Sequence, residues 1–178
     1  MNLNDFTIII PCISFQDVKK CIQNIRKNYR SLKIIISLNK NVKKNNDKNL
    51  KIIVSKFKGI GKKRNIAVDK CKTKYIAFLD SDDIWAKNKL KIQVNFMEKN
   101  NILFSHTSYH VINSNNKIIS SRPARKKIKF QDLIKSCDIG LSTVILKSSL
   151  LLKNKFFFPK LKTKEDYILW LQIIKKIK

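Results

Sequence analysis

Three carboxylates, Asp80, Asp82 and Asp83, directly follow the short apolar run Tyr75–Leu79. That run is too short for a helix of its own, is rich in β-forming residues and is typical of a strand buried on both faces. The acids therefore lie at the carboxyl end of a strand, the edge where open α/β sheets bind ligands. At an effective dielectric constant of about 20, each close pair of acids repels by roughly 4 kcal/mol. A hard divalent cation would offset this repulsion, and Mg²⁺ characteristically bridges one or two carboxylates to substrate phosphates.

The same acids have a simpler interpretation. Asp and Ser are favoured at helix N-termini, so the acids alternatively cap the helix that follows them. One acid would suffice for that role, whereas this stretch has three. The metal and phosphate interpretation is therefore favoured.

A second candidate phosphate site is the segment from Lys58 to Asn65, in which two glycines precede a basic cluster. Glycines let the backbone approach an anion closely, a helix N-terminus offers free amides, and Arg64 can make a bidentate contact. The segment lacks the third glycine of the dinucleotide fingerprint and the GK[ST] of a P-loop. A glycine-containing loop before an ordinary helix explains it equally well.

The third candidate is Asp166, at the start of an apolar helical pattern near the end of the chain. With Thr163 it fits the S/T-x-x-D/E capping box, which would make it a structural cap. If that helix end faces a metal and phosphate site, the carboxylate would instead be a general base for an incoming hydroxyl. Two isolated histidines, His106 and His110, are assigned no role.

Short apolar runs alternate with amphipathic patterns, which predicts an α/β fold with a mainly parallel sheet covered by helices. The expected strands are residues 6–10, 33–38, 50–54, 75–79, 102–104, 109–112, 118–119 and 140–146. The expected helical patterns are residues 17–29, 66–71, 85–97, 130–136 and 166–177. Residues 39–49 are expected to form a polar loop, 114–117 a hairpin turn and 121–129 a basic loop.

The chain has 178 residues and a formal net charge of +27, with an isoelectric point near 10.1. This length predicts a single domain with a sizeable core. Strong positive charge suggests an anionic membrane surface, phosphorylated ligands or nucleic acid. Nearly all of it is lysine spread evenly along the chain, so a solvated basic surface is favoured over attraction to acidic lipid, and nucleic-acid binding is ranked last.

The four cysteines show no CxxC pair and lie in apolar or helical contexts, so buried, reduced thiols are expected. No run approaches the roughly 18 apolar residues that a membrane span needs, and no secretory leader is evident. The expected location is cytoplasmic.

Five segments together resemble the family 2 glycosyltransferases, which are nucleotide-sugar enzymes with the GT-A fold. These segments are FTIIIP, GIGKKRNIAV, KYIAFLDSDDIW, GLSTVILK and KEDYILWLQI. The order and spacing of DSDDIW and the downstream EDYxLW make the resemblance specific, and it covers nearly the whole chain. It implies that residues 1–178 form a single GT-A domain.

The resemblance implies a role for several residues. Asp80 and Asp82 match the family's DxD motif, which holds the donor ribose and a Mg²⁺ or Mn²⁺ ion on the donor diphosphate, with Asp82 the more direct metal ligand. Asp166 matches the acid that deprotonates the acceptor hydroxyl in inverting members. The positions implied at the nucleotide sugar are Pro11, Ile13, Ser37, Arg64, Asp80 and Ser81.

The resemblance has departures. Cys12-Ile13-Ser14 stands where the family usually has an aromatic residue and Asn, and Ser37-Leu38-Asn39 where it has paired acids. In the family both stretches contact the nucleotide base, so these departures leave the identity of the base open. A UDP sugar is the default expectation for the donor. The chain also ends where similar proteins continue. Three alternatives stay open: a truncated chain, a minimal enzyme or a decayed copy.

Two functional hypotheses follow. The first is metal-dependent, inverting transfer of a sugar to a cell-surface glycan or lipid-linked acceptor, with peripheral contact to the anionic inner membrane face and no nucleic-acid partner. The alternative is a non-catalytic nucleotide-sugar-binding module with the same fold.

Overall fold

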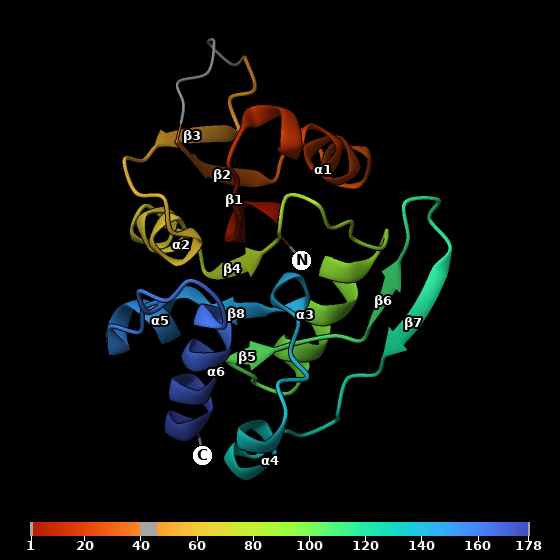
Figure 1. The fold of residues 1–178 in the computed structure, drawn as a ribbon, viewed down its shortest axis with the longest axis vertical. Coiled ribbons are helices and arrows are strands. Elements are labelled where there is room, and N and C mark those ends of the chain that lie inside the picture. Colours follow the sequence, from red (N-terminus) through yellow and green to blue (C-terminus); the bar gives the residue numbers. More distant parts are fainter. Residues whose placement is uncertain (1, 40–45, 178) are drawn as a thin grey trace.

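The computed structural model describes residues 2–39 and 46–177, and its core is a six-stranded sheet of order β3-β2-β1-β4-β8-β5 (Figure 1). The strands of this sheet are β1 (Phe6–Pro11), β2 (Lys33–Leu38), β3 (Leu50–Val54), β4 (Tyr75–Phe78), β5 (Phe104–Ser105) and β8 (Ile145–Lys147). A separate two-stranded sheet pairs β6 (Tyr109–Ile112) with β7 (Ile118–Arg122).

Six α-helices and two short 3₁₀ turns connect the strands. The helices are α1 (Phe15–Asn28), α2 (Ile60–Asp69), α3 (Lys89–Lys99), α4 (Phe130–Lys135), α5 (Ser148–Asn154) and α6 (Glu165–Lys176). The 3₁₀ turns are η1 (Leu3–Asp5) and η2 (Leu141–Thr143).

The order of the strands creates a switch point between β1 and β4. From β1 the chain adds β2 and β3 on one side, then returns to place β4 on the other side, all in parallel. Ligands of open α/β sheets bind outside the carboxyl ends of the strands at such a point. The residues that follow β1 and β4 are therefore positioned to share one site.

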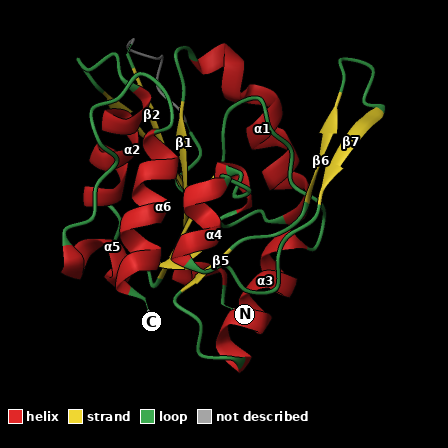
Figure 2. Cartoon of the chain, turned by 60° about the horizontal axis from the view of Figure 1, so that its bottom comes forward, coloured by secondary structure: helices red, strands yellow, loops and turns green. Residues whose placement is uncertain are grey.

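Both faces of the sheet are buried. In β1, Ile8 and Ile10 belong to an apolar cluster with α1 and α3, whereas Ile9 belongs to the opposite cluster with α2, α5 and α6. Figures 1 and 2 show the sheet between these two helical layers. Side chains alternate across a strand, so a continuous isoleucine run serves both layers at once. The predicted α/β fold with a mainly parallel sheet is confirmed.

The predicted strand at 140–146 is wrong in its first half. Residues Leu141–Thr143 form η2, and only Ile145–Lys147 pair in the sheet, antiparallel to β4. The Thr143 hydroxyl donates to the Gly140 carbonyl at 2.6 Å, a local hydrogen bond that competes with extended structure. Because β8 runs against β4, its start lies at the carboxyl end of β4. This reversal brings Ser142 to the acidic stretch.

Two further elements differ from the sequence-based prediction. Strand β7 extends to Arg122, into the predicted basic loop, and helix α5 was not predicted. The predicted polar loop at 39–49 lies partly outside the described residues. Three of the cysteines are buried as predicted, but Cys137 is exposed. No helix in residues 2–39 and 46–177 is long and apolar enough to cross a membrane.

Candidate active site

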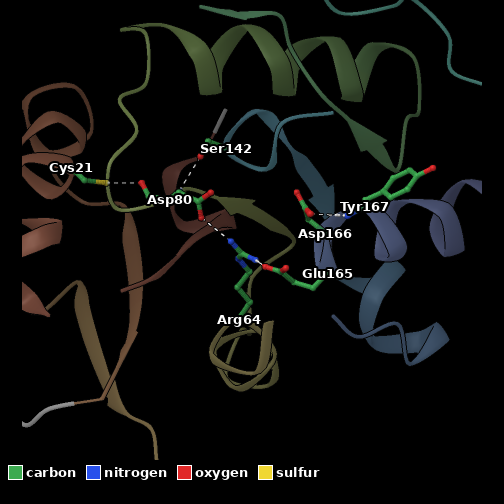
Figure 3. A network of polar contacts seen from close by, with 7 residues as sticks. All are labelled: Cys21, Arg64, Asp80, Ser142, Glu165, Asp166 and Tyr167. Atoms are coloured by element: carbon green, nitrogen blue, oxygen red, sulfur yellow. Dashed lines mark hydrogen bonds and ion pairs between the residues drawn. The ribbon is translucent and has the colours of Figure 1, made fainter. Parts of the chain in front are cut away.

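Asp80 is the first residue after Leu79 at the carboxyl end of β4, and its backbone and side chain are both held. Its amide donates to the Ser142 hydroxyl at 2.9 Å, and its carbonyl accepts a long contact of 3.9 Å from the Cys21 thiol. Its Oδ1 accepts from Arg64 Nη2 at 2.8 Å. Figure 3 shows these contacts converging on Asp80 from α1, α2 and the η2 turn. The carboxylate is therefore held in one orientation at the switch point.

Arg64 joins the acidic stretch to the C-terminal helix. Its Nη1 donates to Glu165 Oε1 at 2.5 Å while its Nη2 holds Asp80, and its side chain is 5% exposed (Figure 3). The guanidinium also lies over the Phe158 ring, 5.2 Å from its centroid. A planar guanidinium can satisfy two carboxylates in fixed directions, which an ammonium group cannot. Arg64 thus fixes the start of α6 against the end of β4.

The acids of this site perturb one another and their neighbours. Burial raises the pKa of Asp80, an effect that the Arg64 charge and its hydrogen bond oppose. Desolvation also raises the pKa of Asp83, against the hydrogen bond from Ser142. The Cys21 thiol, buried beside these carboxylates, has its pKa raised to about 12 by burial and then by Asp83, Asp80 and Asp82. Among the described residues Arg64 pairs with Asp80, whereas Asp82 and Asp83 make no ion pair.

The donor set fits a cation that is shared with a ligand. Asp82 is exposed, and among the described residues no hydrogen bond or ion pair engages its side chain or Asp80 Oδ2. Ser81, between the two acids, is half-buried. Within the described ranges no group of three or more His, Cys, Asp or Glu side chains would hold a metal alone. Mg²⁺ needs only one or two protein carboxylates when phosphates and water supply the other ligands.

Asp166 is the second residue of α6, next to the Glu165 that Arg64 holds. Its Oδ1 accepts from the Tyr167 amide at 2.8 Å, and the Tyr167 hydroxyl donates to carbonyls of α4. The predicted capping box between Thr163 and Asp166 is wrong, because the N-cap is Lys164, in the left-handed region at φ 62°. The contacts Asp80–Arg64–Glu165 therefore place Asp166 at the same edge of the sheet as the acidic stretch (Figure 3).

The glycine segment is built for close packing of helices. A Cβ on Gly61 would lie 3.1 Å from Glu165 Cγ, 3.1 Å from Phe158 Cβ and 3.2 Å from the Pro159 carbonyl oxygen. A Cβ on Gly59 would meet nothing within 4 Å. Gly61 thus lets α2 approach the segment that leads into α6. Nη1 and Nη2 of Arg64 donate to carboxylates, and its buried Nε has no hydrogen-bond partner among the described residues. A contact between Arg64 and phosphate stays a prediction.

Lys63 is a fully buried cation at the end of β1. Its Nζ donates to the Cys12 carbonyl oxygen at 2.8 Å, and burial lowers its pKa. Pro11, which precedes Cys12 in the chain, is buried, and the Ser37 hydroxyl on β2 is buried without a hydrogen-bond partner among the described residues. Pro11 and Ser37 therefore form part of the floor behind this edge and are not exposed to solvent.

An open hollow of about 470 Å³ lies beyond the carboxyl ends of β1, β2 and β3. Its lining residues are Ile13, Asn39, Ser55, Lys56 and Lys58. Ile13 is 68% exposed. The Asn39 amide nitrogen donates to the carbonyls of Ser55 at 3.0 Å and Phe57 at 2.8 Å. Because a carbonyl can only accept, these bonds fix the amide orientation and leave Asn39 Oδ1 as the group available to a ligand.

Glu165 and Lys63 were not among the predicted site residues, whereas Asn39 was predicted only as part of the stretch Ser37-Leu38-Asn39 that would contact the nucleotide base. A signal existed for Lys63, since Lys63 and Arg64 share a helical face with Ala67 and Val68, which are apolar and buried. A basic pair on an apolar face predicts buried partners of opposite charge or free carbonyls. No local signal identified Glu165, whose partner Arg64 lies 101 positions away in the sequence.

Residues 7–157 match the family described as Glycosyl transferase family 2. The chain is 45% identical over 130 residues to the UDP-Glc:alpha-D-GlcNAc-diphosphoundecaprenol beta-1,3-glucosyltransferase WfgD of Escherichia coli, covering 72% of this chain and 50% of that protein. An uncharacterized glycosyltransferase of Rickettsia conorii is 36% identical over 191 residues, covering 98% of this chain and 31% of that protein. The chain thus spans half or less of the length of these two relatives.

Solved structures show the same fold. The crystal structure of S. aureus TarS 1-349 superposes with a TM-score of 0.72 at 19% identity, covering 96% of this chain and 55% of that chain. The complex of TarS 1-349 with UDP-GlcNAc superposes with a TM-score of 0.71 at 20% identity. The similarity confirms the predicted GT-A architecture.

Proposed function

The chain belongs to glycosyl transferase family 2, and from that premise we propose that it transfers a sugar from a nucleotide-diphosphate sugar to an acceptor hydroxyl. The observation that carries this proposal is the contact series Asp80–Arg64–Glu165, which ties an acidic stretch to the helix that carries Asp166. Such a site has groups for both sides of a displacement reaction. Acids for a donor diphosphate lie at one end, and a carboxylate for the acceptor lies at the other.

Asp82 and the free oxygen of Asp80 would hold a Mg²⁺ or Mn²⁺ ion on the donor diphosphate. Such an ion, when bound, neutralises charge that gathers on the departing diphosphate. Arg64 acts in this proposal by orienting Asp80, since its Nη1 and Nη2 both donate to carboxylates. The buried charge of Lys63 at the end of β1 adds positive potential to the edge where the diphosphate would lie.

Asp166 is the proposed general base. It takes the proton of the acceptor hydroxyl as that oxygen bonds to the anomeric carbon, while the bond from that carbon to the diphosphate oxygen breaks. The nucleoside diphosphate leaves with the bonding electron pair. Attack from the face opposite the leaving group inverts the configuration at the anomeric carbon. Asp166 lies in the first turn of α6, next to the Glu165 that Arg64 holds.

A uridine base is the proposed occupant of the open hollow. Asn39 Oδ1 is an acceptor, and the N3 position of uracil is a donor, whereas the N3 position of cytosine is an acceptor. The WfgD name specifies UDP-Glc as its donor, and TarS is known with UDP-GlcNAc bound, which supports the same choice. The proposed uridine preference is tested by comparing UDP and CDP as competitors of donor binding, since the two nucleotides have the same ribose and phosphates and differ only in the base. UDP is expected to compete at least about tenfold better, and Asn39→Ala should remove the difference.

The proposed acceptor is a glycan or a lipid-linked saccharide. WfgD is named for a diphosphoundecaprenol acceptor, and the chain matches that enzyme over 72% of its own length. An acceptor of that class lies at a membrane surface. The net charge of +27 would attract the chain to such a surface if its lipids are anionic. Peripheral membrane contact and the expected cytoplasmic location remain predictions.

The alternative, a nucleotide-sugar-binding module without activity, makes a different prediction. Thermal unfolding with a panel of nucleotide sugars and Mn²⁺ identifies a donor, and a donor at 100 times its dissociation constant should add about 2.7 kcal/mol. Donor turnover is then compared between the wild type, Asp82→Ala and Asp166→Asn. An enzyme loses turnover in both variants, and only Asp82→Ala also loses metal-dependent binding. A protein that binds donor but turns over none in any form is the module.

A further inference from the structure

The β6–β7 hairpin and the stretch after it form a distinct surface, defined here as the basic hairpin (residues 109–129). It projects from the body on the side of α3, away from α5, in both Figure 1 and Figure 2. Strands β6 and β7 pair only with each other among the described strands. The basic hairpin is therefore an appendage of the sheet and not part of its core.

Aliphatic side chains are exposed near its turn. Ile118 is 60% exposed, Ile119 63%, Ile112 43% and Val111 36%. A register shift between Val111 and Ile112 interrupts the pairing, and Ile112 faces Ile118 across the strands. Leaving such side chains in water carries a cost that burial would remove. Apolar groups clustered on a projecting hairpin indicate a surface that is covered in use.

The same segment carries only positive charge. Residues 109–129 include six basic side chains and no Asp or Glu: Lys117, Arg122, Arg125, Lys126, Lys127 and Lys129. All six are exposed. Arg125 pairs with Asp138 at 2.7 Å, and no described carboxylate makes a salt bridge with the other five. The partner of this surface must therefore supply negative charge next to apolar material.

An anionic lipid bilayer has both properties, and we infer that the basic hairpin inserts its isoleucines between the headgroups of such a membrane. Each lysine or arginine near an anionic leaflet adds to the attraction, and buried aliphatic side chains anchor the contact. A second copy of the chain would bring equal positive charge and is disfavoured. Single-stranded nucleic acid is bound through exposed aromatic rings, whereas the exposed large side chains here are aliphatic.

The hairpin also lies next to the candidate active site. The Tyr109 ring at its base is 3.2 Å from the position that a Cβ on Gly140 would occupy. Gly140 starts the turn whose Ser142 hydroxyl accepts from the Asp80 amide. The base of the basic hairpin is therefore linked to the turn that contacts the acidic stretch. The inference rests on the proposed function in one respect, since a lipid-linked acceptor gives this placement its purpose.

Vesicle flotation tests the inference without donor, acceptor or metal, so its outcome is independent of sugar transfer. The full chain is mixed with phosphatidylcholine vesicles that contain or lack phosphatidylglycerol. The key pair of variants is Ile119→Asp in the hairpin and Leu152→Asp on α5, whose leucine is 43% exposed. Both lower the net charge equally, so a difference between them reports insertion. Circular dichroism and thermal melting establish that both variants are folded.

The expected result is binding to the anionic vesicles, unchanged by Leu152→Asp and weakened at least about tenfold by Ile119→Asp. The pair Lys126→Glu/Lys127→Glu should also weaken binding far more than Lys175→Glu/Lys176→Glu at the end of α6. Equal binding by Ile119→Asp and Leu152→Asp would overturn the inference, as would absence of wild-type binding. Displacement by single-stranded RNA with no effect of Ile119→Asp would assign the surface to nucleic acid. A dimer abolished by Ile119→Asp would assign it to a second copy.

Discussion

Replacing Arg64 with methionine is the most direct test of how the site is assembled. Methionine keeps much of the volume of the side chain but leaves Asp80 and Glu165 without their shared cation. The Arg64 side chain is 5% exposed and that of Glu165 is 11% exposed, so water cannot easily replace the lost contacts. Removing one partner of a buried ion pair costs about 3–5 kcal/mol, because the remaining charge is uncompensated.

That loss is large enough to measure by melting. For a domain of 150–250 residues, 1 kcal/mol corresponds to roughly 2–4 °C, so Arg64→Met should lower the Tm by about 6–20 °C. Arg125→Met is the matched control. Its ion pair with Asp138 is equally short at 2.7 Å, but its side chain is 49% exposed, and such pairs contribute about 0–1 kcal/mol.

The deficit of Arg64→Met should also depend on pH. Burial already raises the pKa of Asp80, and loss of the Arg64 charge would raise it further. An acid whose pKa is higher in the folded state than in the unfolded state binds its proton more tightly when folded. Its contribution to stability therefore falls as the pH rises from the ordinary Asp value of about 3.9 through the raised pKa. The deficit should be largest at neutral pH and shrink on acidification.

Urea denaturation at several pH values measures both effects, with Glu165→Gln and the double variant completing a cycle. A coupling of about 0.5–3 kcal/mol between Arg64 and Glu165 is expected for residues in contact. The reasoning is refuted if Arg64→Met costs no more than Arg125→Met, or if its deficit grows as the pH is lowered.

Three further predictions follow from the same contacts. Asp166→Asn should lower the transfer rate about 10²- to 10⁴-fold in steady-state assays while donor binding by calorimetry is unchanged, and weaker donor binding would count against a base role. Gly61→Ala should cost about 1–3 kcal/mol in urea titrations, because its Cβ would lie 3.1–3.2 Å from Glu165, Phe158 and Pro159, whereas Gly59→Ala, with open space around it, should cost less. Mass spectrometry after brief alkylation of the folded protein near neutral pH should find the exposed Cys137 labelled and the buried Cys12 and Cys21 unlabelled. Burial also raises the pKa of Cys12 to about 11 and that of Cys21 to about 12, which keeps both as unreactive thiols. Labelling of Cys21 before Cys137 would contradict the burial.

The amino-acid sequence by itself determined the layout of the fold. Runs such as Ile8–Ile10 can serve only a strand buried on both faces, and the placement of Asp80 directly after such a strand assigns it to the ligand-binding edge. These features depend on local periodicity, which a short stretch of sequence shows by itself. For the same reason the hairpin of β6 and β7 was predictable from its turn residues.

Only the tertiary structure decided which charges meet. Arg64 holds Asp80, 16 positions away, and Glu165, 101 positions away, and neither ion pair was predicted from the sequence. Ser142 reaches Asp80 because β8 runs antiparallel to β4, which its sequence pattern does not disclose. Ion pairs between distant residues depend on the path of the whole chain, and a buried arginine must find acids wherever that path places them. The physical reason is that the hydrophobic pattern of a few neighbouring residues determines a strand or a helix, whereas the partner of a buried charge can lie anywhere in the sequence.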